Sequence, residues 1–148
     1  MFQRILSLFH SNAHVTPLPE ADAKHALGAL LVRAAKIDKA YMFEEIEHID
    51  DLLAHRFSLN PVQAAKLRAE CEVLESAMPD TAALATVLHD AIDMEEREAT
   101  VLALWEVVFA DGVEVAAEDD LLHQLEALLG VSPERSRELH DLAQNARA

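Results

Sequence analysis

Hydrophobic residues recur every three or four positions along most of the chain, which is the spacing of an α-helix with one buried face. No segment shows the sustained alternation of a β-strand. Only 3 glycines and 5 prolines interrupt the 148 residues, which argues against a turn-rich β fold. The pattern predicts helices at about Glu20–Ile37, Phe43–Arg56, Pro61–Ala77, Thr81–Ile92 and Asp93–Phe109, a sixth helix that contains Leu121–Leu129, and a last helix that starts at Pro133 and contains Leu139–Ala143.

The same pattern predicts which residues face the core. The first helix is expected to bury one stripe that contains Leu27, Leu30 and Leu31, and Trp105 is expected to be a core residue of the fifth helix. The stripe expected for the third helix is Ala65, Ala69, Val73 and Leu74. Together these stripes predict a compact all-α bundle of about seven to eight short helices, the N-terminal segment included.

Residues with strong preferences for helix ends support these boundaries. Asn60 and Ser132 each precede a proline, which is the pattern of an N-cap followed by the first helical residue. Asp93 is expected to begin the fifth helix. Gly130 is expected to end the sixth, because glycine adopts the left-handed conformation found after many helices.

Residues 1–19 are expected to lie outside the main domain, which we assign to residues 20–148. The apolar side chains of Met1–His10 are suited to docking on the domain itself, on a second copy in a homodimer, or on a membrane surface. Ser11–Pro19 has the two prolines and the polar residues of a linker. No apolar run approaches the ~20 residues of a transmembrane helix.

The formal net charge is −15, from 27 acidic and 12 basic side chains. Such a surface repels nucleic-acid phosphates, which excludes that class of partner, and it attracts cations and basic protein surfaces. Solubility alone is the alternative explanation for the charge. Cys71 is the single cysteine, which excludes an intramolecular disulfide, fits a reducing cytoplasmic location and predicts a small packed side chain.

Two stretches of the chain match when they are aligned. Leu30–Pro61 and Leu102–Pro133 each read as a helix, an acidic loop, a second helix and a capped start to a third. The alignment places Asp38 on Asp111, Glu45 on Glu118, and Leu59-Asn60-Pro61 on Val131-Ser132-Pro133. It predicts two pseudo-repeated halves that pack face to face around one core.

The second copy carries a recognisable motif. Ala110-Asp111-Gly112 is followed by Glu118 and then by Leu128-Leu129-Gly130-Val131-Ser132. Together, the loop, the glutamate and the Leu-Gly-Val-Ser ending resemble the motif of the TerB-like tellurite-resistance family. The resemblance covers roughly residues 26–143. The first copy departs from the motif, since Lys39 stands at the glycine position of the loop.

The resemblance implies a non-enzymatic module for stress response or interaction, with a role in resistance to tellurite and other chemical stress. It also implies a cytoplasmic protein that binds a protein partner and acts with membrane-associated complexes, at the inner membrane face. It gives weight to metal binding through the acidic positions. The alternative from another class is an enzyme or sensor whose carboxylates hold a catalytic or redox metal.

The candidate metal ligands are Asp38, Glu45, Asp111 and Glu118, which stand at equivalent places in the two copies. Carboxylate oxygens suit Ca²⁺, Mg²⁺ or Mn²⁺, and a two-fold arrangement of the loops brings four of them together. The alternative is structural. Each glutamate then reaches back to the start of its own helix as in a capping box, and each aspartate accepts loop N–H groups.

Other metal motifs fit less well. An EF-hand loop that began at Asp111 would need oxygen ligands where Val113 and Val115 stand. The Glu45-x-x-His48 spacing matches one half of a di-iron site, which requires a second such motif in register. We find no nucleophile with an adjacent base and no phosphate-binding glycine loop.

Overall fold

The computed structural model describes residues 22–37, 43–109 and 116–147, of which 116–118 and 147 are described by their backbone alone. Across these ranges the chain forms seven α-helices and no strand, which confirms the all-α prediction. The boundary predicted near residue 19 lies outside the described residues. The helices are α2 Ala23–Lys36, α3 Phe43–Phe57, α4 Pro61–Ala77, α5 Thr81–Ala91, α6 Met94–Val108, α7 Ala116–Leu129 and α8 Pro133–Arg147.

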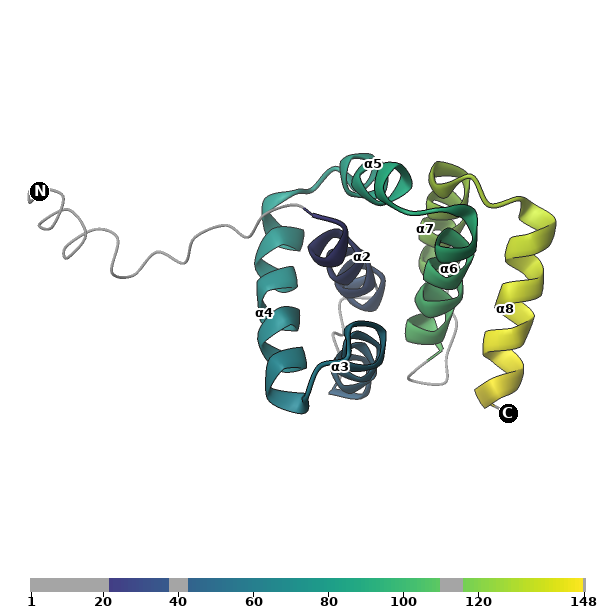
Figure 1. The fold of residues 1–148 in the computed structure, drawn as a ribbon. Helices are drawn as coiled ribbons and strands as arrows, with labels where there is room; N and C mark the ends of the chain where they lie inside the picture. The colour runs from purple at the N-terminus through teal and green to yellow at the C-terminus, as the bar shows by residue number, and fades with distance from the viewer. Residues whose placement is uncertain (1–21, 38–42, 110–115, 148) are drawn as a thin grey trace, which may run out of the picture.

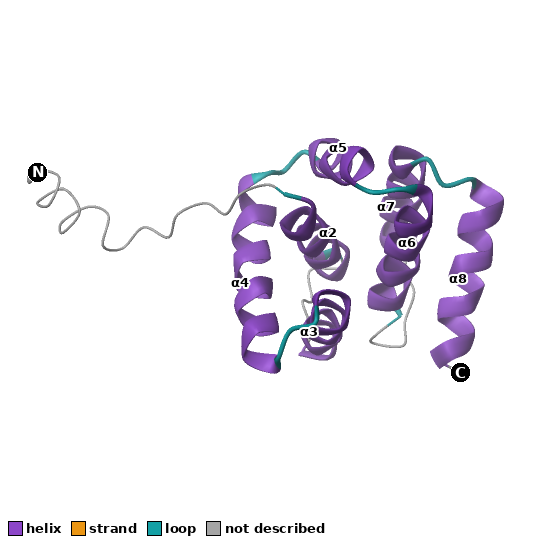
Figure 2. Ribbon diagram, in the orientation of Figure 1, coloured by secondary structure: helices purple, strands orange, loops and turns teal. Residues whose placement is uncertain are grey.

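The helices are arranged in two groups that meet at α2. In Figure 1, α4 stands at one end beside α2 and α3, α8 stands at the other end beside α6 and α7, and α5 crosses between the groups. Helix α2 packs against every helix from α3 to α7. Figure 2 shows that short loops join α3 to α4, α4 to α5, α5 to α6 and α7 to α8. The core is therefore continuous, with α2 at its centre.

Helix α2 is buried on most of its circumference rather than along the single stripe that the sequence predicted. Gly28, Ala29, Val32 and Ala35 are buried in addition to the expected leucines. A helix that is apolar nearly all round is stable only when other elements surround it. Neither α2 nor any other described helix is long and apolar enough to cross a membrane.

A close approach between α2 and α4 explains the glycine in the middle of α2. A methyl group added at Gly28 would overlap Sγ of Cys71 and would lie 3.0 Å from its Cβ. The thiol therefore occupies the space that a side chain would need, and Cys71 is 0% exposed. Burial, with a contribution from nearby Glu70, raises the pKa of Cys71 to about 12. The predicted role of Cys71 as a packed residue is confirmed.

The buried face of α4 differs from the predicted stripe. Ala64, Leu67, Cys71 and Leu74 are buried, whereas Ala69 is exposed. Alanines lie on both sides of this helix, so hydrophobicity alone does not fix its orientation. The contact with Gly28 does, because it requires Cys71 to face α2.

The predicted helix starts are confirmed. Asn60 and Gln63 form a reciprocal capping box at the start of α4. Asp93 caps α6 by accepting the N–H of Glu96 at 2.9 Å. Ser132 Oγ accepts the N–H of Arg135 at 3.1 Å where α8 begins. Trp105 is 2% exposed, as expected of a core residue.

Helices α3 and α7 end in the same way, at positions that the repeat alignment equates. Ser58 has φ 57° and Gly130 has φ 77°, both in the left-handed region. The next N–H reaches back five residues in each case, from Leu59 to the carbonyl of Ala54 and from Val131 to that of Glu126, both at 2.9 Å. This shared turn supports the repeat, although superposition of the two halves stays a prediction.

We expect Gly28→Ala to lower the unfolding free energy by about 1–3 kcal/mol through overpacking. In an open helix the same change would raise stability by about 1 kcal/mol. Urea denaturation of a double-mutant cycle with Cys71→Ala provides the check, since removal of Sγ should return part of the loss. Strictly additive losses in the double variant would contradict the contact.

Ser58 and Gly130 both have a left-handed backbone conformation, and substitutions at the two positions should change stability in opposite directions. Ser58→Gly should stabilise the protein by about 0.5–1 kcal/mol, because glycine removes the cost of a side chain at positive φ. Gly130→Ala should destabilise it by about 1–2 kcal/mol for the same reason. Thermal denaturation of both variants is the measurement, and equal signs would show that backbone conformation does not determine these effects.

Candidate functional site

Among the four predicted metal ligands, the structure describes one side chain. Glu45 is the third residue of α3, and Glu118 is the third residue of α7, where the backbone alone is described. Asp38 and Asp111 lie outside the described residues. The prediction that each glutamate stands in the first turn of its helix is confirmed by the helix bounds. Whether the four carboxylates meet stays a prediction.

Glu45 is 0% exposed, although its neighbour Glu44 is exposed. Burial of a carboxylate is costly unless hydrogen bonds or a cation compensate for the lost water. The N-terminus of a helix supplies partial positive charge, which favours an acidic residue there. Position three of the helix serves both predicted roles, since a capping glutamate and a metal-binding one would both stand there.

The end of α2 and the start of α7 border one open groove of about 410 Å³. Ile37, the last described residue before the first acidic loop, lines this groove. Asp120 and Leu121 line it from α7, just after Glu118. The segment that enters the first predicted acidic loop therefore lies near the segment that follows the second.

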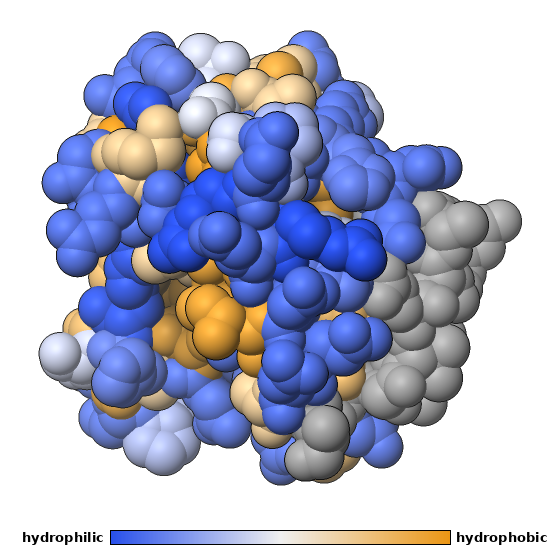
Figure 3. Space-filling model, turned by 90° about the vertical axis from the view of Figure 1, so that its right-hand side faces the viewer, coloured by the Kyte–Doolittle hydropathy of each residue, from blue (hydrophilic) through white to orange (hydrophobic). Residues whose placement is uncertain are grey.

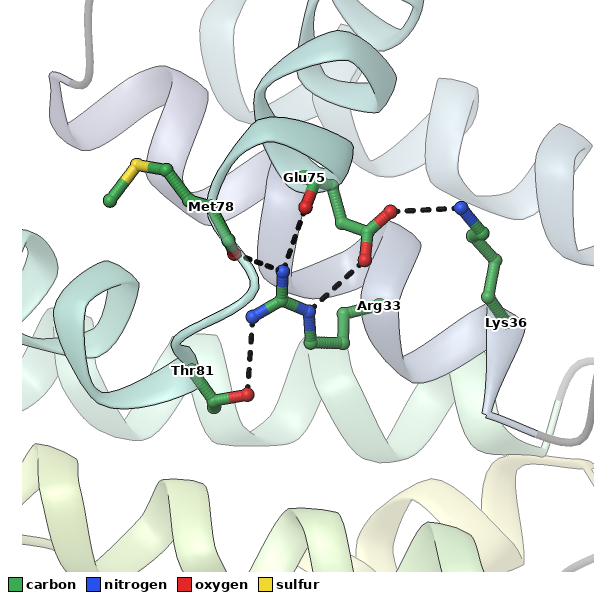
Figure 4. A network of polar contacts seen from close by, with 5 residues as sticks. All are labelled: Arg33, Lys36, Glu75, Met78 and Thr81. Carbon is green, nitrogen blue, oxygen red and sulfur yellow. Dashed lines mark hydrogen bonds and ion pairs between the residues drawn. The ribbon is translucent and has the colours of Figure 1, made fainter.

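A polar network holds the wall of this groove (Figure 4). Arg33 donates to Glu75 Oε2 and to Thr81 Oγ1, each at 3.1 Å, and to the backbone carbonyls of Glu75 and Met78. Lys36 donates to Glu75 Oε1 at 2.9 Å. The side chains of Arg33 and Glu75 are nearly buried, so the network fixes the junction of α4 and α5 onto α2. Glu75 also offsets the positive charges of Arg33 and Lys36.

Within the described ranges, no group of three or more histidine, cysteine, aspartate or glutamate residues is placed to hold a metal ion. The Glu45-x-x-His48 pair is therefore not part of such a group among the described residues. The raised pKa of Cys71, caused by burial, keeps its thiol protonated and unsuited to ligation at neutral pH.

A second cavity, of about 260 Å³, lies between α6, α7 and α8, and the sequence analysis did not identify it. Trp105 contributes from α6, Asp119, His123 and Glu126 from α7, and Ser136, Arg137 and His140 from α8. Its signal in the sequence is polar residues at helical spacing, namely 119, 123 and 126 on one helix and 136 and 140 on the next.

Comparison with known proteins agrees with the fold and the motifs. The family model described as tellurite resistance protein TerB matches residues 24–141, from the first turn of α2 into α8. No curated protein and no solved structure gave a match. The match spans nearly all of the helical domain, and the chain therefore belongs to the TerB family of tellurite resistance proteins.

Proposed function

We propose that this chain is a non-enzymatic TerB module of the response to tellurite and other chemical stress, and that it binds a divalent cation through its paired acidic positions. The ligands in this proposal are Asp38, Glu45, Asp111 and Glu118. The observation that carries the proposal is the fully buried carboxylate of Glu45 in the first turn of α3, whose counterpart Glu118 has the same place in α7.

The groove between α2 and α7 supports the pairing of the two loops. Ile37 and Asp120 line the same groove, so Ile37 lies close to the first turn of α7, which contains Glu118. Asp38 is the residue that follows Ile37 in the chain. A cation bound there would bridge the two halves of the molecule. Asp111 and Glu118 form the stronger pair in the proposal, because Lys39 places a competing positive charge in the first loop.

The partner in this proposal is a protein with a basic surface, since the chain carries a net charge of −15. The proposed location is the cytoplasm, at the inner face of the membrane, where the family is linked with membrane-associated complexes. Cation binding would then set the charge and rigidity of the acidic loops that such a partner contacts.

We expect Ca²⁺, Mg²⁺ or Mn²⁺ to raise the melting temperature of the wild-type protein. At an ion concentration of ~100 times the Kd, the shift should be about 5–10 °C. Asp111→Asn should abolish the shift, and Asp38→Asn should reduce it less. Glu95→Gln is the matched control, because it removes one carboxylate from an exposed site on α6 and should leave the shift intact.

Glu45→Gln separates the two roles of the buried glutamate. A glutamine serves in a capping box as well as a glutamate does, so stability without metal should be retained if Glu45 caps α3. As a metal ligand it should bind far less well, and the ion-dependent shift should disappear. A wild-type melting temperature that none of the three ions changes would refute cation binding and leave the capping role.

A further inference from the structure

The cavity between α6, α7 and α8 combines features that the acidic-loop proposal does not use. Its volume of about 260 Å³ is enough for a small ligand or one side chain of a partner. It opens among hydrophilic residues but has an aromatic wall. Figure 3 views the molecule from the α8 side, where hydrophobic side chains are visible through a recess in a mainly hydrophilic face.

The aromatic wall is held in place by ring contacts. Trp105 stacks on Phe109 with centroids 6.2 Å apart and meets the ring of His140 edge to face at 4.7 Å. The ring of His123 lies 6.4 Å from Trp105, again at a steep angle. Trp105 also donates its indole N–H to Ser136 Oγ at 3.5 Å. The wall is therefore preorganised before any ligand enters.

Glu126 supplies a negative charge to the lining of the cavity. It is 6% exposed, and Oε1 lies 3.3 Å from Nδ1 of His123. Its other oxygen, Oε2, is buried and accepts no hydrogen bond from any described residue. A buried carboxylate oxygen without a donor costs free energy, and a ligand that brings a donor recovers it. Asp119, which also lines the cavity, adds a second acidic group.

We propose that this cavity binds a guanidinium group. A guanidinium is planar, presents several N–H donors to a carboxylate and stacks on aromatic rings, and these properties match Glu126 and Trp105 together. An anion is disfavoured by the two acidic side chains. Arg137, the one arginine of the lining, is largely exposed and lies 3.8 Å from Asp141, so solvent screens its charge.

A guanidinium group can come from two sources, the arginine side chain of a protein partner and a free small guanidine. The probes are therefore N-acetyl-arginine amide and methylguanidinium, with N-acetyl-citrulline amide as the neutral equivalent of the first. Trp105 is the single tryptophan of the chain, so its fluorescence reports on the cavity directly. Isothermal titration calorimetry gives the affinity independently.

Saturable binding of either cationic probe to the wild-type protein, with a change in Trp105 fluorescence and no comparable binding of the citrulline probe, is the expected result. Glu126→Gln keeps the size of the side chain and should weaken binding tenfold or more. The matched control Glu95→Gln removes the same charge from an exposed position and should leave the affinity unchanged. Circular dichroism confirms that each variant is folded.

Preference for the blocked arginine would identify a partner side chain as the source, and preference for methylguanidinium would identify a free small cation. Equal binding of the citrulline probe would overturn the proposal, as would the absence of binding to the wild-type protein at millimolar concentrations. Unchanged affinity in a folded Glu126→Gln variant would overturn it too. None of these outcomes depends on the acidic loops, so the test is separate from that of divalent-cation binding.

Discussion

The close contact between α2 and α4 is the constraint on which the rest of the fold depends. Gly28 has no side chain, so Cys71 can enter the surface of α2 and the two helices can approach closely. Helix α2 is then free to present its other sides to α3, α5, α6 and α7. Each of these helices buries one face against a common centre, and the burial of apolar surface there supplies the main driving force for folding.

The polar interactions act at the edges of this core and set where helices begin and end. Side-chain caps at Asp22, Asn60, Asp80 and Asp93 satisfy backbone N–H groups that no helical carbonyl reaches. Arg33 has a similar role for carbonyls, because it gathers two of them from the segment that ends α4. These contacts add direction to packing that is otherwise non-directional, and they hold the short α5 across the two groups of helices.

The sequence was a good guide to local structure because caps and turns depend on near neighbours. Asn60-Pro61, Asp93 and Ser132-Pro133 mark helix starts through bonds that span three residues or fewer. It was a poorer guide to orientation. The face of α4 depends on Gly28, which lies far away in the chain, and alanine periodicity alone indicated Ala69 instead. The cavity at Trp105 was missed for a related reason, since residues of three helices form it.

The position of Cys71 has a consequence for how the protein reacts with electrophiles and oxidants. Its thiol fills space at the centre of the molecule, and burial keeps it protonated. Electrophiles and oxidants that attack thiolates therefore meet no reactive sulfur from cysteine while α2 and α4 stay together. Modification becomes feasible only when those helices separate. The rate at which a thiol reagent labels the protein therefore measures how often its core opens. That opening exposes Cys71, the single cysteine of the chain, to oxidation.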